Sequence, residues 1–177
     1  MVHLGRWQDS AVVVDEGDSE QLKTRRAELS DCLDLFRWRN DPLTLKMSIH
    51  STPLEYGPHE EWFLASLQNP LRMIFIVQNR RGEKVGMTRF DVNLERRVAT
   101  VSINLNPEFR GKKLSSLVLD LSCKSFFASG KKMDLEAVVR FDNQASIRCF
   151  QQCGFEKQVS NSGFYLFHKT GIENGHP

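Results

Sequence analysis

The spacing of apolar residues changes along the chain, and each spacing predicts one kind of element. Residues 21–27 alternate loosely between polar and apolar, which suits a short strand. Residues 30–39 place apolar side chains three and four positions apart, the period of a helix with one buried face. That helix is expected to end at Asp41-Pro42, because the residue before a proline is disfavoured in helical conformation. The same period predicts a second helix over residues 58–69.

Three strands are predicted in the middle of the chain. Residues 73–77 are continuously apolar, which indicates a strand covered on both faces. Residues 84–92 form the second strand, and a bulge would explain why its apolar parity changes between Met87 and Phe90. Residues 101–105 alternate cleanly, as a strand with one buried face does. The short polar turns between these strands predict an antiparallel meander.

The C-terminal part of the chain returns to alternating helices and strands. A helix is expected to run to about Ser129, where Gly130 is placed to cap it. A strand over residues 135–139, a helix over 143–152 and a hairpin that turns at 161–163 complete the pattern. The order β-α-α-β-β-β-α-β-α-β-β predicts a mixed sheet with helices on its faces.

The size and composition are those of one globular domain. The chain has 177 residues, of which 40% are hydrophobic and 26% charged, and one domain usually holds roughly 100–200 residues. We expect a single domain over residues 21–168, with residues 1–20 as an arm or an extra edge strand and 169–177 as a tail. The net charge of +2 is too small for wholesale binding to a nucleic-acid backbone.

Nothing in the apolar pattern predicts a membrane segment. No apolar run approaches the roughly 20 residues that a membrane span needs, and the short run at residues 11–14 is too short for a signal peptide. Cys149 and Cys153 lie four residues apart but lack a neighbouring His pair to complete a zinc site. We therefore expect a cytoplasmic protein with buried thiols, no metal, no membrane partner and no nucleic-acid partner.

The loop at residues 110–116, Arg-Gly-Lys-Lys-Leu-Ser-Ser, carries the clearest chemical signal. It leaves a predicted strand and enters a predicted helix, whose first turn offers unpaired backbone N–H groups and the positive end of a dipole. Such a terminus is suited to a pyrophosphate, and the basic and hydroxyl side chains would add contacts to it. The alternative interpretation is a charged helix start on the surface.

The same loop resembles the acetyl-CoA loop of GNAT acetyltransferases, which has the pattern Arg/Gln-x-x-Gly-x-Gly/Ala. The match begins at Arg110 and departs at Lys113 and Ser115, where the family has glycine or a small residue. A second segment, Asn143-x-x-Ser146-x-x-x-Phe150-x-x-x-Gly154-Phe155, resembles the family's Asn-x-x-Ala/Ser-x-x-x-Tyr-x-x-x-Gly-Phe with all spacings kept.

The resemblance covers residues 21–168 and implies the α+β GNAT fold. That fold is a mixed α/β arrangement with a mostly antiparallel sheet of about seven strands and helices on both faces. It also implies acetyl-CoA as the cofactor and transfer of an acetyl group to a primary amine. The cofactor contacts that it implies are Ile103, Asn104, Leu105, Arg110, Gly111, Lys112, Lys113, Leu114, Ser115, Ser116, Asn143, Ser146 and Phe150.

Acetyl transfer to an amine needs a route for the amine's proton and donors for the tetrahedral oxyanion. In the family, backbone N–H groups of the fourth strand serve as the donors, here around residues 103–105. Glu136 and His59 are the candidate bases, with Asp91 as a third. The non-catalytic alternatives are that Glu136 faces solvent and that His59 is a capping or surface residue.

The family's usual proton donor to the departing thiolate is a tyrosine, and Phe150 stands in its place. Phenylalanine cannot donate a proton, so this role is vacant in the sequence. Tyr56, Tyr165, Ser146 or a water is the expected substitute. A thiolate is also a tolerable leaving group without help, because the reference pKa of a thiol is about 8.5.

The N-terminal half is expected to bind the acceptor. Its Trp38-Arg39-Asn40 and His-x-x-Trp62 segments resemble those of N-acetyltransferases acting on nucleotide-linked amino sugars, as in pseudaminic acid synthesis. They are similar, less closely, to segments of the ribosomal-protein alanine N-acetyltransferases. The alternative is that both tryptophans anchor the core and that Arg39 makes a structural ion pair.

In the sugar interpretation, Arg39 meets a phosphate, because its planar fork suits one. The acceptor-binding residues are then Arg39, Asn40, Met47, Trp62 and Phe90, with the last three as an apolar wall. A protein N-terminal acetyltransferase and a catalytically retired acyl-CoA-binding domain remain as alternatives. Strand edges in this fold often pair between subunits, so a homodimer is one possible arrangement.

Overall fold

Helices and strands follow the predicted order in the computed structural model, which describes residues 21–159 and 163–171. The predicted arm at 1–20, most of the predicted hairpin turn at 161–163 and most of the predicted tail lie outside the described residues. The elements are β1 (Lys23–Arg26), η1 (Leu29–Asp31), α1 (Cys32–Arg39), α2 (Pro42–Met47), α3 (Tyr56–Gln68), β2 (Arg72–Gln78), β3 (Lys84–Asn93), β4 (Val98–Leu105), η2 (Pro107–Phe109), α4 (Ser115–Ala128), β5 (Asp134–Arg140), α5 (Gln144–Gln152), β6 (Glu156–Val159) and β7 (Phe164–Lys169).

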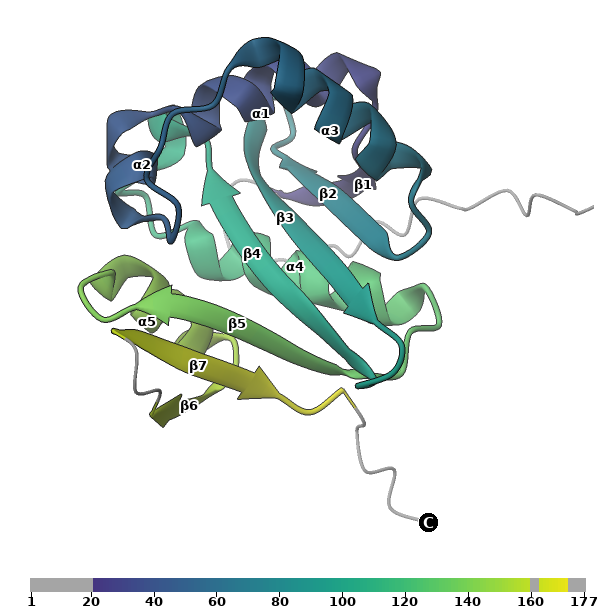
Figure 1. Cartoon of the computed structure of the whole chain (residues 1–177), viewed down its shortest axis with the longest axis vertical. Coiled ribbons are helices and arrows are strands. Elements are labelled where there is room, and N and C mark those ends of the chain that lie inside the picture. The colour runs from purple at the N-terminus through teal and green to yellow at the C-terminus, as the bar shows by residue number, and fades with distance from the viewer. Residues whose placement is uncertain (1–20, 160–162, 172–177) are drawn as a thin grey trace, which may run out of the picture.

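The described strands form one seven-stranded sheet in the order β1-β2-β3-β4-β5-β7-β6. Neighbouring strands are antiparallel except β4 and β5, which run parallel. The parallel pair holds only between residues 98–100 and 134–136. Beyond it the two strands diverge, and their ribbons separate widely in Figure 1. The predicted mostly antiparallel sheet of about seven strands is therefore confirmed.

Helices cover both faces of this sheet, as the sequence predicted. On β2, Ile74 and Ile76 pack in a cluster with α1 and α3. The intervening Phe75 and Val77 belong to the clusters that contain α4. Figure 1 shows α4 behind the sheet and α1 and α3 on the near side. The continuously apolar β2 is thus buried on both faces because each face has its own helical layer. None of the described helices is long and apolar enough to cross a membrane.

Helix α2 was missed by the sequence prediction, which took Asp41-Pro42 only as a helix stop. The structure starts a new helix there, with Pro42 in its first turn. Proline suits that position because its absent N–H would have no partner in the helix. The Asp41 side chain caps the turn, and its Oδ1 accepts hydrogen bonds from the backbone N–H groups of Leu43 and Thr44, both at 3.1 Å. Aspartate is among the preferred capping residues.

The bulge in β3 lies earlier than the sequence predicted. The register against β2 is continuous from Asp91 back to Gly86 and shifts between Gly86 and Lys84, so that Val85 is the extra residue. Residues 87–90 therefore keep a regular alternation. Phe90 and Thr88 are buried on one side, whereas Met87 and Arg89 are half-buried on the other. A bulge placed on the wrong side of these residues reverses the face that each is expected to occupy.

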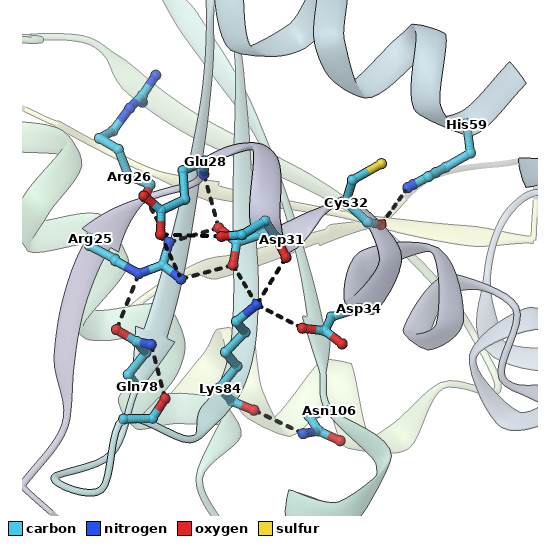
Figure 2. Close-up of polar contacts among 12 residues, drawn as sticks. Arg25, Arg26, Glu28, Asp31, Cys32, Asp34, His59, Gln78, Lys84 and Asn106 are labelled. Carbon is cyan, nitrogen blue, oxygen red and sulfur yellow. Dashed lines mark hydrogen bonds and ion pairs between the residues drawn. The ribbon is translucent and has the colours of Figure 1, made fainter. Parts of the chain in front are cut away.

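An ion network around Asp31 fixes the start of α1 against the sheet (Figure 2). The Asp31 side chain is fully buried. Arg25 donates to both of its oxygens at 2.7 and 2.8 Å, and Lys84 lies 2.8 Å from Oδ1. Burial alone would raise the pKa of Asp31, but the hydrogen bonds from Arg25 and Lys84 lower it below its ordinary value. The carboxylate thus ties β1 and β3 to the helix that supplies the site below.

Replacing Asp31 by Asn should lower the free energy of unfolding by about 2–4 kcal/mol, because it leaves two half-buried cations, each 22% exposed, without their main partner. Asp34→Asn is the matched control: it also contacts Lys84, at 2.7 Å, but is 35% exposed, so its loss should be about 1 kcal/mol or less. Urea unfolding measures both. The Asp31 contribution is present above the unfolded-state pKa of about 3.9 and is lost as pH falls through the lower folded-state value. Equal losses in the two variants at pH 7 would contradict this assignment.

Candidate active site

A cavity of about 800 Å³ opens where β4 and β5 diverge. Residues 101–105 of β4 and 138–140 of β5 line it, together with the loop at residues 110–115. Successive residues of a strand direct their N–H groups to opposite edges, so alternate amides of 101–105 face the cavity. Helices α1, α2, α3 and α5 supply further lining side chains. The cavity therefore combines an unpaired strand edge with a helix N-terminus.

The loop before α4 has the backbone of a ligand-binding turn. Gly111 and Lys113 both have left-handed conformations, with φ of 75° and 60°. A non-glycine residue in that region is strained by roughly 1–2 kcal/mol, which explains why the resembling pattern has glycine where Lys113 stands. Lys113, Leu114 and Ser115 line the cavity at the start of the helix. The loop thus presents the first turn of α4 and one cation to a bound anion.

Arg110 does not point freely at the cavity, although it lines it. Its Nη1 donates to Asp41 Oδ1 at 2.5 Å and its Nη2 to Thr44 Oγ1 at 2.6 Å. Burial would raise the pKa of Asp41, but the hydrogen bond from Arg110 and the capped amides lower it overall. The loop at residues 110–115 is therefore tied to α2, which lines the same cavity.

Helix α5 presents an amide, a hydroxyl and an aromatic ring to the cavity. The side chain of Asn143 accepts from the N–H of Ser146 at 3.1 Å and donates to the Met47 carbonyl at 3.3 Å. Phe150 lines the cavity but is only 3% exposed, and its ring packs on Phe155 and Phe167. Phe150 is therefore a wall of the cavity as well as part of the core.

The four substitutes expected for the missing tyrosine acid are now distinguished by position. Ser146 lines the cavity. Tyr56 lies outside the lining, and its hydroxyl donates to Glu60 at 3.1 Å. Tyr165 lies outside it as well, packed against Phe141. Of the three side chains expected as substitutes, Ser146 therefore has a hydroxyl at the cavity, and water is the other expected source of a proton.

His59 lines the cavity from α3, and one of its ring nitrogens has no hydrogen-bond partner among the described residues. It is 4% exposed, and its Nε2 lies 3.2 Å from the Cys32 carbonyl (Figure 2). A carbonyl only accepts, so Nε2 carries the proton and Nδ1 keeps a lone pair. Within the described residues Nδ1 has no hydrogen-bond partner. Burial lowers the pKa of His59, against the opposing effect of the carbonyl, so the ring is neutral at pH 7.

A family model of the acetyltransferase (GNAT) domain matches residues 21–156. The chain belongs to the GNAT acetyltransferases. It is an acetyl-CoA-dependent N-acetyltransferase, because that is the reaction of the family. No curated protein sequence matches the chain.

Several solved structures share the fold of this acetyltransferase. The spermidine N-acetyltransferase of Vibrio cholerae, in complex with CoA and spermine, superposes with a TM-score of 0.71 at 17% identity, covering 83% of this chain and 92% of that one. A domain from Methanocaldococcus jannaschii gives 0.72 at 22% identity, with 85% and 99% covered. An aminoglycoside acetyltransferase with coenzyme A gives 0.71 at 17% identity, with 85% and 95% covered. At such identities the likeness extends to the fold alone.

Most of the residues predicted to contact the cofactor come together in the cavity of this acetyltransferase. Those that line it are Ile103, Asn104, Leu105, Arg110, Gly111, Lys113, Leu114, Ser115, Asn143, Ser146 and Phe150. Lys112 and Ser116 lie outside the lining. The Lys112 ammonium sits over the Phe109 ring, 4.5 Å from its centroid, and the Ser116 carbonyl accepts from the Cys153 thiol at 3.2 Å.

Three other predicted site residues also fall outside the lining. Glu136 lies where β4 and β5 are still paired, and both of its oxygens accept from Arg96, at 3.0 and 3.1 Å. Phe90 points to the opposite face of the sheet, where its ring stacks on that of Phe126 with the two ring centroids 4.4 Å apart. Asn40 is used in a reciprocal pair of hydrogen bonds with the Leu54 backbone. Arg39, Met47, His59 and Trp62 do line the cavity.

Sequence reasoning missed Arg89, which lines the cavity from β3. It shares a face with Met87, one residue away from the predicted Phe90. The error follows from the misplaced bulge, since a shift of one residue in a strand changes the face. Asp91, the third candidate base, lies outside the lining and accepts from Arg72 at 2.5 Å.

Arg110→Ala should weaken acetyl-CoA binding by roughly 1.5–3 kcal/mol, the value of a charge-assisted contact. Asp41→Asn should tighten it by several-fold, because asparagine keeps the cap of α2 but no longer competes with phosphate for the guanidinium. Calorimetric titration of the full chain with CoA measures both. Unchanged affinity in Arg110→Ala, or weaker binding in Asp41→Asn, would show that Arg110 does not exchange Asp41 for the cofactor.

Proposed function

We propose that this enzyme acetylates the primary amine of a nucleotide-linked amino sugar. The observation that carries the proposal is the charge of the cavity. Among the described residues, no Asp or Glu lines it, whereas five cationic side chains do. These cations are Arg39, Arg89, Arg110, Lys113 and Arg140, of which Arg110 and Arg140 are already paired with carboxylates that lie outside the lining. An acceptor that carries phosphates is suited to such a lining, and acetyl-CoA accounts for only part of it.

The same lining argues against a polycationic acceptor such as the spermidine or aminoglycoside of the structural neighbours. Two unit charges about 8 Å apart repel by about 2 kcal/mol at an effective dielectric constant of about 20. Several such pairs would oppose binding of a polyamine. A polyamine site also needs carboxylates, and the described lining offers none.

The apolar part of the acceptor side fits a deoxysugar or a base. Met47, Leu54 and Trp62 line it, and the Trp62 ring is held by packing against His59 and Phe63. Pockets that bind small molecules combine such apolar walls with a few fixed polar groups. The cavity volume of about 800 Å³ lies in the range of roughly 300–1,000 Å³ that is typical of small-molecule sites.

In this proposal the thioester lies along the open edge of β4. The amides of the pantetheine arm complement a strand edge, and the β4 amides at 103–105 are placed to stabilise the tetrahedral oxyanion. The pyrophosphate binds at the first turn of α4, with Lys113 and the released Arg110. No tyrosine is required, because the thiolate is a tolerable leaving group and Ser146 is placed to donate a proton to it.

His59 is the proposed base, acting directly or through one water. Its ring is neutral, its Nδ1 lone pair is unused and it lines the acceptor side. A histidine accepts the amine's proton only in its neutral form, and a pKa near or below the working pH keeps the ring in that form. Glu136 is not carried forward, because it lies outside the lining and its charge is already used by Arg96.

Release of free thiol from acetyl-CoA tests the acceptor. We expect turnover with a uridine-diphosphate 4-amino-sugar and none above background with spermidine or with a peptide that has a free N-terminus. Turnover with the peptide alone would favour a protein N-terminal acetyltransferase, and turnover with spermidine would remove the charge argument. CoA binding without turnover on any acceptor would favour a retired acyl-CoA-binding domain.

His59→Gln should lower kcat by roughly 10²–10⁴-fold. Because burial depresses the pKa of His59, the wild-type rate should fall only as the pH drops below about 6.5, the ordinary value. That acidic limb should vanish in the variant. His50→Gln is the control, since His50 lines the same cavity but bonds only through its carbonyl among the described contacts. A wild-type rate in His59→Gln, or an equal loss in His50→Gln, would rule out this assignment.

A further inference from the structure

We propose that Arg39 and Arg89 together form a binding site for an oxyanion of the acceptor, a phosphate or a carboxylate. The site lies on α1 and β3, on elements other than the loop at residues 110–115 that is suited to the phosphates of CoA. The inference rests on the proposed function in one respect only: the acceptor is taken to occupy this side of the cavity. The anion itself is inferred from the two guanidinium groups.

Arg39 has a charged donor with no protein partner. Its Nη2 donates to the His50 carbonyl at 2.5 Å. Its Nη1 is buried and has no hydrogen-bond partner in residues 21–159 and 163–171. A buried donor on a charged group that lacks an acceptor costs more free energy than an unpaired neutral donor does. Since Arg39 lines the cavity, a ligand is the natural source of the acceptor.

Arg89 adds a second cation that is only partly neutralised. Its Nε lies 2.8 Å from Asp91 Oδ2 but lacks hydrogen-bond geometry to it. Asp91 is shared, because its other oxygen accepts from Arg72. Asp91 is thus divided between Arg89 and Arg72, and within residues 21–159 and 163–171 no carboxylate pairs with Arg39. Burial and the charge of Arg89 both lower the pKa of Arg39, so the two guanidiniums are close enough to repel.

Trp62 holds the second guanidinium in place before any ligand binds. The Arg89 guanidinium lies 5.5 Å from the Trp62 ring centroid, and that of Arg72 lies 5.4 Å from it. Arginine is suited to stacking on an aromatic face while its planar fork stays available to an oxyanion. A preorganised cation loses less conformational entropy on binding than a flexible one. The two guanidinium groups are therefore held rigidly, as in a binding site, and an anion between them would balance their positive charge.

A purely structural role for Arg39 makes the opposite prediction. If its function were to hold the loop at His50, removing the guanidinium would destabilise the fold. If the two arginines instead form an empty anion site, replacing Arg39 removes the repulsion between the two guanidinium groups. It also removes a buried N–H group that has no acceptor. Arg39→Gln should then keep the melting temperature within about 2 °C of wild type or raise it, while anion binding is lost.

The test uses the full chain saturated with CoA, so that the phosphate-binding loop is already occupied. Thermal stabilisation by inorganic phosphate and, separately, by acetate reports binding to the remaining site. We expect saturable stabilisation by at least one of the two, and a loss of affinity of tenfold or more in both Arg39→Gln and Arg89→Gln. The comparison between phosphate and acetate identifies the oxyanion that fits.

Arg140→Gln is the matched control for charge. Arg140 also lines the cavity, but its guanidinium is bound by Asp142 at 2.8 and 2.9 Å. The control should bind the probe as wild type does. Equal losses of anion affinity in all three variants would show that the anion responds only to the summed positive charge of the cavity. That result would overturn the proposal. So would the absence of any saturable stabilisation, or a fall in melting temperature of Arg39→Gln without a change in anion affinity.

Failure here and failure of the proposed function can be told apart. Acetylation of the amino-sugar nucleotide with an unchanged KM in Arg39→Gln would overturn the anion site and leave the function intact. Phosphate binding that depends on Arg39, without acetylation of any sugar nucleotide, would support the anion site and overturn the amino-sugar nucleotide as the acceptor.

Discussion

The divergence of β4 and β5 is the constraint on which the site depends. The two strands pair over only three residues each, after which their ribbons separate (Figure 1). Residues of both strands beyond the paired stretch line the same cavity. Buried backbone N–H and C=O groups need partners, so an open edge inside a fold calls for a ligand that carries amides and a carbonyl. The helix N-terminus after β4 lies at the end of that edge. In the proposed function, cofactor, oxyanion donors and acceptor are all arranged relative to this single break in the sheet.

The other half of the site depends on how α1 is anchored. The buried Asp31 carboxylate ties α1 to β1 and β3 through Arg25 and Lys84 (Figure 2). The first residue of α1, Cys32, offers the carbonyl that fixes the His59 ring. Arg39 thus stands on a helix held by charge, and the proposed base on α3 is hydrogen-bonded to that same helix. The half lined by β4 and the loop at residues 110–115 is held by backbone geometry. The Arg110–Asp41 contact joins the two halves.

The sequence was informative where backbone chemistry repeats locally, and misleading where the sheet decides. The spacing of Asn143, Ser146 and Phe150 placed one face of α5 correctly, because a helix has a fixed period. The loop before α4 was found for the same reason, as its strand, turn and helix signals are adjacent. The prediction that Phe90 lines the cavity was wrong, since it depended on where β3 bulges against β2, and that register is set by a partner strand. The unpaired state of Arg39 had no sequence signal at all, because it follows from which carboxylates other elements bring nearby.

Hydrogen–deuterium exchange of the full chain with and without acetyl-CoA tests the central claim most directly. Binding between the diverging strands should protect the amides of residues 101–105 and of the first turn of α4. The amides of β1 and β2, which pair on both sides or lie far from the cavity, should be unaffected. Protection confined to other segments, with no change at residues 101–105, would contradict the account of how this acetyltransferase holds its cofactor.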